Sequence, residues 1–327
     1  MSALRPPTGA CRFSLPGDAA EVLESVVRHR LMTAGQVHEL HLADKSLRST
    51  QRVLTMLARA GLVSCVRPGR SEAIWLATDA GAEAVDGGGA RSRPRRRARV
   101  SPASAAGPLR AHTLAINDVG RAFVRAARQL GHECHPADWE HEVALRVSDR
   151  PGSEQLVVDA VLHYTRRFAE GDELMVRFVE VDRGTETVQR LTSKLVAYRQ
   201  LHSYRPKLGP SWRDRYLVFP KILVVLGGRL SMHQLERRRA TLLQLAEQTG
   251  VAETITAMVT TLPELEQHGP FAPVFWTVGA CPSPVDFAGE VPELGEPTGA
   301  ADREGRRGRQ LSLLPPGGVP ASQERPR

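Results

Sequence analysis

The sequence predicts an α+β protein in which a small, mainly helical domain precedes a larger domain of mixed helices and strands. The chain has 327 residues, enough for two domains of about 150 residues each, and 41% of them are hydrophobic. Proline, glycine and charge divide it into segments. These are a disordered tail (1–17), a first domain (18–85), a basic flexible linker (86–110), a second domain (111–281) and a disordered tail rich in proline and glycine (282–327).

The first domain begins with a helical pattern. Apolar residues spaced three and four apart predict three helices within residues 18–61. Asp18, Thr33 and Ser46 can cap the helix N-termini, because their side-chain oxygens can accept hydrogen bonds from free backbone N–H groups. Gly61 can end the third helix, since glycine tolerates the left-handed conformation that helix ends require.

A strand–turn–strand pattern follows the three helices. Two short apolar strands, at 62–66 and 73–76, flank a turn at 67–70, and a short helix through residue 85 comes next. Three helices and a hairpin are the pattern of a winged helix-turn-helix domain, whose third helix enters the major groove of DNA. Winged helices also serve as protein–protein modules, so that alternative stays open.

Side chains suited to DNA occur on the third helix, on the turn and in the linker. Arginine and glutamine can read base edges, and arginine also binds phosphate. The linker could lie along the DNA backbone or in a minor groove, or could be only a solubilising tether. The candidate DNA-binding residues are Arg48, Ser49, Gln51, Arg52, Arg67, Arg70, Arg95, Arg96 and Arg97.

Charge and cysteine usage narrow the function classes. Lys and Arg outnumber Asp and Glu by 44 to 36, which gives a net charge of +8 and favours a polyanionic partner such as nucleic acid. No apolar run approaches the ~20 residues of a membrane helix, and the N-terminus lacks the pattern of a signal peptide. The four cysteines form no CxxC pair, which fits a reducing cytoplasm. We therefore expect a cytoplasmic protein that is not bound to a membrane.

The second domain alternates between helical and strand patterns. Three successive strands predict an antiparallel meander, and the helix after them would carry the chain across to a strand on the other side. The predicted order is a helix (112–130), strands (139–147, 156–164, 173–182), a helix (187–202), a strand (221–226), a helix (231–248) and a last strand (255–259).

This order resembles the core of the PD-(D/E)xK nuclease-like superfamily, which has the restriction-endonuclease-like α/β fold. The resemblance implies one acid on the second strand and one on the third, here Asp159 and Glu180. Two such carboxylates can hold Mg²⁺, which polarises a phosphodiester and activates water. Glu140, near the start of the first strand, could be an auxiliary acid.

The third strand departs from the acid-x-Lys motif of that superfamily. Asp182 stands two residues after Glu180, where the resemblance predicts lysine. Arg183 could supply positive charge but is a poor proton acceptor, whereas Lys194 on the following helix could point back at the same cleft. The site could be active, weakly active or a binding relic. In the alternative interpretation, the two acids lie at strand ends and are held by arginine or water.

Several stretches resemble the replication-relaxation family of actinobacterial plasmids and integrative elements. They are HTLAINDV (112–119), WE (139–140), DA (159–160), EVDRGTE (180–186) and KLVAY (194–198), and the resemblance extends over about 18–230. It implies a role in plasmid replication, DNA relaxation or mobilisation. Double-stranded DNA is the expected partner, with a homodimer and replication or conjugation proteins as further candidates.

The motifs of other enzyme classes are missing from the sequence. There is no phosphate-binding GxxxxGK[ST], and no His-hydrophobe-His motif of a tyrosine relaxase. We therefore expect a mobile-element DNA-binding protein with possible Mg²⁺-dependent endonuclease activity. The alternatives are a non-catalytic transcriptional or replication regulator, whose second domain is a degenerate nuclease fold for dimerisation or partner binding, and a toxin-like or defence nuclease.

Overall fold

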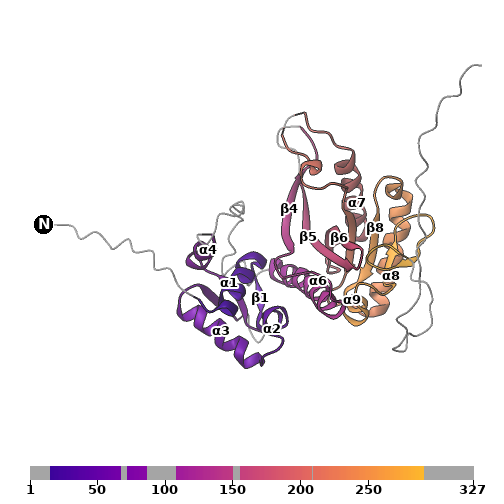
Figure 1. Ribbon diagram of the computed structural model, residues 1–327. Helices are drawn as coiled ribbons and strands as arrows, with labels where there is room; N and C mark the ends of the chain where they lie inside the picture. The colour runs from indigo at the N-terminus through magenta and orange to yellow at the C-terminus, as the bar shows by residue number, and fades with distance from the viewer. Residues whose placement is uncertain (1–14, 68–71, 87–107, 150–154, 208, 291–327) are drawn as a thin grey trace, which may run out of the picture. The chain divides into compact units, whose positions relative to one another are not determined.

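The computed structural model describes residues 15–67, 72–86, 108–149, 155–207 and 209–290 (Figure 1). The predicted linker from residue 87 to 107 lies outside these ranges, and with it Arg95, Arg96 and Arg97. Arg70, at the predicted turn between two strands, also lies outside them. The predictions for these residues stay predictions.

The N-terminal region combines helices with a small antiparallel sheet. Strand order in the sheet is β1-β3-β2. The elements are α1 (Gly17–His29), β1 (Met32–Thr33), α2 (Ala34–His41), α3 (Leu47–Arg59), β2 (Val63–Val66), β3 (Ile74–Ala77) and α4 (Asp79–Asp86). The three predicted helices and the strand pair are therefore present, and a two-residue strand, β1, joins the pair.

Two of the three predicted N-caps are confirmed. Thr33 and Ser46 accept hydrogen bonds from backbone N–H groups in the first turns of α2 and α3. The prediction for Asp18 is wrong, because α1 begins at Gly17 and its N-cap position is Pro16, two residues before Asp18. Asp18 lies instead in the first turn of α1 and forms an ion pair with Lys45.

The larger region is built on a mixed sheet of seven strands in the order β10-β9-β8-β7-β6-β5-β4. Its strands are β4 (Trp139–Arg146), β5 (Gln155–Phe168), β6 (Gly171–Asp182), β7 (Lys221–Leu226), β8 (Ala257–Thr261), β9 (Phe275–Thr277) and β10 (Pro284–Val285). Its helices are α6 (Pro108–Leu130), α7 (Val188–Ser203), α8 (Met232–Gln248) and α9 (Leu262–His268). Short 3₁₀ turns lie at Trp212–Asp214 and Val251–Glu253.

The predicted meander and crossover are confirmed. Strands β4, β5 and β6 pair antiparallel, and β7 pairs parallel with the far side of β6 after α7 has carried the chain across. The predicted strand at 255–259 is present as β8, which begins two residues later at Ala257, but it is not the last strand, because β9 and β10 follow it. The boundary of the C-terminal tail at 282 is also too early, since Phe287 is fully buried in the core.

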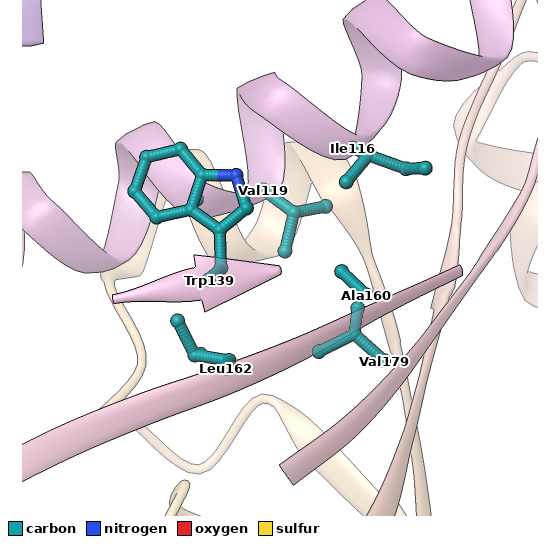
Figure 2. Close-up of a pocket in the computed structure, with 7 residues that line it drawn as sticks. Ile116, Val119, Trp139, Ala160, Leu162 and Val179 are labelled. Atoms are coloured by element: carbon teal, nitrogen blue, oxygen red, sulfur yellow. The ribbon is translucent and has the colours of Figure 1, made fainter. Parts of the chain in front are cut away.

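The two faces of the sheet carry different helices. One hydrophobic cluster contains α6 residues such as Phe123 and the α9 residue Leu265, whereas the other contains Leu195 of α7 and Leu242 of α8. Helix α6 approaches the sheet closely at Gly120, where an added Cβ atom would lie 2.5 Å from the ring of Trp139. Figure 2 shows this apolar contact, whose small cavity is lined by Ile116, Val119, Gly120, Trp139, Ala160, Leu162 and Val179.

Side-chain hydrogen bonds link segments on either side of residues 87–107. The amide of Gln36 on α2 donates to Asp118 Oδ1 (2.8 Å) on α6, and Asn117 Nδ2 donates to the backbone oxygen of Leu31 (2.7 Å). The ring of His29 stacks on Trp139, with 4.3 Å between the ring centroids. The N-terminal helices and α6 thus belong to one continuous hydrophobic cluster.

Candidate functional site

The structure brings three of the four predicted catalytic residues together. Lys194 Nζ donates a hydrogen bond to Asp159 Oδ1 at 3.2 Å and forms an ion pair with the carboxylate of Glu180. Asp159 lies on β5, Glu180 on β6 and Lys194 on α7. A single ammonium group therefore connects carboxylates from two neighbouring strands.

Asp159 occupies the point on β5 where pairing with β6 ends and where one position of the β4 ladder is skipped. Pairing with β6 begins at Ala160, and the β4 ladder skips the position of Asp159 because no pair forms between it and Glu142. Glu142 has a positive φ of 50°, which is uncommon for a residue other than glycine. The backbone N–H of Val181 on β6 donates to Asp159 Oδ2 (2.9 Å), so the side chain takes a hydrogen bond where the regular ladder has ended.

The break in the ladder changes which face the strands bury. Ala160 and Leu162 on β5 belong to the hydrophobic cluster with α6, whereas Val158 and Leu156 belong to the cluster with α7 and α8. Residues two apart in a regular strand share a face. Asp159 therefore lies where β5 changes the face that it buries. Side chains from both α6 and α7 can contact it there.

Two further side chains complete the cluster, and sequence reasoning did not select them as site residues. His112 near the start of α6 lies with Nε2 3.4 Å from Asp159 Oδ2, and the hydroxyl of Tyr198 on α7 donates to Glu180. Tyr198 follows Lys194 by four residues, a spacing that places both on one side of a helix. His112 opens the stretch HTLAINDV, so each residue lay in a stretch that carried the family resemblance.

Burial and charge act in opposite directions on the two carboxyl groups. Burial alone would raise the pKa of Asp159, but the hydrogen bond from His112 and the charge of Lys194 outweigh it and hold that pKa well below its usual range. Glu180 is only 2% exposed, and burial together with the nearby Asp159 carboxylate raises its pKa well above the usual range. The two acids thus differ strongly in their affinity for a proton.

The donor set suits a hard divalent cation. Mg²⁺ is commonly bound through one or two carboxylates, with water and substrate phosphate as its other ligands. Asp159 and Glu180 provide two such carboxylates. No group of three or more His, Cys, Asp or Glu side chains arranged for a metal occurs in the described ranges, so other ligands would have to come from water or substrate.

Asp182, at the position where the acid-x-Lys motif predicts lysine, has an ion-pair partner. Asp182 forms an ion pair with Arg238 on α8, whose Nη2 donates to Oδ1 at 3.1 Å, and Oδ1 also accepts from the N–H of Gly184. No contact found in the described part of the chain joins the Arg183 side chain to Asp159 or Glu180. Arg183 follows Asp182, the last residue of β6, so it lies outside the strand that carries Glu180. The structure does not bring it into the cluster.

The predicted auxiliary acid has a different neighbour. Glu140 on β4 forms an ion pair with Arg215 (3.6 Å), in the segment between α7 and β7. It therefore lies on the strand next to Asp159 and connects that strand to a basic loop.

The predicted DNA-reading residues lie on the surface of α3. Arg48, Gln51 and Arg52 are exposed, and Ser49 is partly exposed and accepts a hydrogen bond from Arg52 Nη2 (3.1 Å). Arg67, directly after β2, is also exposed. Helix α3 buries Leu54 and Leu57 on its opposite side, so among the described residues its polar face is exposed.

Together, the mixed sheet and the cluster define an α+β protein with a carboxylate–lysine site at the point where two central strands diverge. The chain belongs to the replication-relaxation family, whose family model matches residues 23–210. No curated protein sequence matches it.

Among solved structures, the restriction endonuclease FokI is similar at 12% sequence identity and a TM-score of 0.26. The match covers 77% of this chain and 43% of FokI, so the chain corresponds to less than half of that enzyme. In the ranges that the structure describes, no helix is long and apolar enough to cross a lipid bilayer.

Proposed function

We propose that this chain is a DNA-binding protein of a mobile element that acts in plasmid replication, DNA relaxation or mobilisation and cleaves phosphodiester bonds with a divalent metal ion. The observation that carries the proposal is the placement of Lys194 between Asp159 and Glu180. Paired carboxylates with an adjacent cation suit a reaction in which both a metal and a phosphate must be held. Membership of the replication-relaxation family supports the DNA context.

Each residue of the cluster would have a separate task. Asp159 and Glu180 would hold Mg²⁺, which when bound polarises the phosphate and lowers the pKa of a coordinated water. The compact positive charge of Lys194 would attract a phosphate oxygen. Lys194 would thus take the role of the lysine that the acid-x-Lys motif places at position 182. His112 would orient Asp159 through its 3.4 Å contact, and the hydroxyl of Tyr198 would orient Glu180.

The N-terminal region would locate the DNA. Its three helices and antiparallel strands support a winged helix-turn-helix assignment, with α3 entering the major groove. Arg48, Gln51 and Arg52 would then reach base edges from the first turns of α3, and Arg67 would contact phosphate.

The test is incubation of the purified full chain with supercoiled plasmid, and with single-stranded and branched DNA, in Mg²⁺ or Mn²⁺. We expect metal-dependent nicking that disappears in Asp159→Ala/Glu180→Ala. The matched control is Glu170→Ala/Asp172→Ala, which removes two exposed acids from the β5–β6 hairpin and should cleave normally. Cleavage that persists in the first double variant would overturn the assignment of the site.

A second candidate function is that of a regulator without catalysis. It is favoured by the near-complete burial of Glu180, which Tyr198 and Lys194 already contact within the protein. In that case the cluster would be a structural remnant, and the larger region would serve dimerisation or partner binding. Binding of DNA without cleavage under every metal condition would support this candidate.

A further inference from the structure

A packed loop between α7 and β7 exposes two adjacent aliphatic side chains. Leu217 is 105% exposed and Val218 is 76% exposed, whereas Trp212 and Tyr216 nearby are each only 7% exposed. Single apolar residues on a surface are ordinary, but a fully exposed pair in a well-packed loop is not explained by the fold. The exposure of this pair therefore suggests that the two side chains bind a partner.

Aromatic contacts fix the shape of the loop. The ring of Trp212 meets that of Phe219 with 4.9 Å between centroids, so residues on both sides of the exposed pair are joined. The guanidinium of Arg213 lies 4.0 Å from the Trp212 ring centroid and donates to the backbone oxygens of His202 and Tyr204. Leu217 and Val218 thus lie in a loop segment whose flanking residues are packed together.

The loop lies against the strands that carry the candidate site. Tyr216 contacts Phe178 on β6, with 5.3 Å between ring centroids, and Phe178 precedes Glu180 by two residues. Phe178 also stacks on Tyr198, whose hydroxyl donates to Glu180. On the other side, Arg215 forms its 3.6 Å ion pair with Glu140 on β4. The loop therefore packs against β6, which carries Glu180, and contacts β4.

The charge of the loop points to a nucleic acid as the partner. Residues 204–219 contain four basic side chains and one acidic side chain. Arg205, Lys207 and Arg215 are exposed, so the loop that presents the aliphatic pair also presents cations. Two aliphatic side chains are a small anchor for a protein partner, whereas DNA-bending proteins commonly insert one or two apolar side chains between base steps while cations hold the flanking phosphates.

We propose that Leu217 and Val218 form a wedge that enters DNA bound at the Asp159–Glu180 site and unstacks one base step. The preferred substrate class is then a duplex that is easily opened, such as one with a nick, a mismatch or a branch, because unstacking such a step costs less free energy. The position of the wedge relative to the scissile bond rests on the proposed function, but the unstacking of DNA does not require cleavage.

The test uses the full chain and short duplexes that carry 2-aminopurine, whose fluorescence rises when it loses its stacking neighbours. Duplexes with a nick, with a mismatch and without a defect are compared without divalent metal, so that no cleavage occurs. We expect a severalfold rise in fluorescence with the wild-type protein on the nicked duplex. Leu217→Ser/Val218→Ser should abolish this rise and weaken binding to nicked DNA about tenfold, which equals about 1.4 kcal/mol.

The matched control is Leu174→Ser, which removes an aliphatic side chain that is 62% exposed at another place, on β6. It should leave the fluorescence rise unchanged. An unchanged signal when the wild-type protein binds DNA, or a wedge variant that behaves as the wild type does, would overturn the proposal. A change in oligomeric state of the wedge variant in light scattering, with unstacking intact, would show that the pair is a protein interface instead.

The fluorescence assay and the cleavage assay together separate this inference from the proposed nuclease activity. If the wild-type protein unstacks DNA but never cleaves it, the nuclease proposal fails and the wedge stands. If it cleaves DNA without unstacking, the wedge fails and the nuclease proposal stands.

Discussion

Lys194 on α7 donates a hydrogen bond to Asp159 on β5 across 3.2 Å, although 35 residues separate the two in the chain. The same ammonium group forms an ion pair with Glu180 on β6. The positive charge of the cluster thus comes from a helix, and the strand position two residues after Glu180 is occupied by an aspartate with a partner of its own. Lys194 on the neighbouring helix thus supplies the positive charge that the acid-x-Lys motif would supply from the strand.

We expect Lys194→Ala to lower the rate of plasmid cleavage by about 10²–10³-fold, the usual cost of removing one group that stabilises developing charge. The reason is that no other cation in the described ranges contacts both carboxylates. The measurement is the initial rate of nicking in Mg²⁺. Arg190→Ala removes an exposed cation from the same helix and should cleave as the wild type does. Equal rates for the two variants would exclude a catalytic role for Lys194.

The affinity for divalent metal should rise with pH. Burial and the Asp159 carboxylate raise the pKa of Glu180, so this group binds a proton more tightly than a free glutamate does, and a metal must displace that proton. Asp159 has a lowered pKa and stays ionised, so it adds no slope over this range. Titration calorimetry with Mn²⁺ at pH 6 and pH 8 should show tighter binding and less proton release at pH 8.

Glu180→Gln cannot exchange a proton at that position and serves as the control for this pH dependence. Its residual Mn²⁺ affinity should be weak and nearly independent of pH. Wild-type binding that is equally tight at pH 6 and pH 8, with no proton released at either, would show that Glu180 is already ionised before the metal arrives.

Restoring the acid-x-Lys motif should harm the protein. In Asp182→Lys, the new ammonium would face Arg238, and the buried ion pair of Asp182 would be lost. Breaking a buried pair by removing one partner costs about 3–5 kcal/mol of unfolding free energy. Urea unfolding should show this loss, and the cleavage rate should not rise. An Asp182→Lys protein of normal stability and increased activity would show that position 182 still faces the site.

The long elements of this fold could be predicted because their signals are local. Thr33 and Ser46 cap helices where the sequence predicts caps, and the alternating pattern of β4 places its buried residues correctly. Strands β9 and β10 are only three and two residues long, too short to show a period of two. The burial of Phe275 on β9, of Val285 on β10 and of Phe287 after them depends on the face that α6 covers, which no local pattern reveals.

The candidate site was predictable in part for a related reason. Asp159 and Glu180 stand at strand positions that the meander brings together, and Lys194 lies on the helix that must cross above them. His112 reaches Asp159 because the pairing of β5 with β6 ends at that residue and the strand exchanges faces there. Glu142, opposite Asp159, has a positive φ, and because it is not a glycine the sequence gives no sign of this conformation.

Close packing of α6 against the sheet gives a stability prediction. Gly120→Ala should gain up to about 1 kcal/mol from helix propensity. The added methyl group would lie 2.5 Å from the Trp139 ring, however, and overpacking in a core costs about 1–3 kcal/mol. Since Trp139 is almost fully buried and cannot move freely, we expect a net loss in urea unfolding. Gly35→Ala in α2, whose nearest neighbour would lie at 3.6 Å, is the control and should be neutral or stabilising.

The DNA-reading role proposed for α3 predicts different effects for different arginines. Arg48→Ala and Arg52→Ala change exposed side chains in the first half of α3, where recognition residues reach base edges, so each should cost about 1–3 kcal/mol of affinity for the preferred sequence. Arg67→Ala should weaken binding to all sequences alike and reduce the salt dependence by about one unit, as loss of a phosphate contact does. The measurement is fluorescence anisotropy at several salt concentrations. Arg59→Ala, at the far end of α3, is the control, and equal effects of Arg48→Ala, Arg52→Ala and Arg59→Ala would mean that α3 is a solvated face and not a recognition helix.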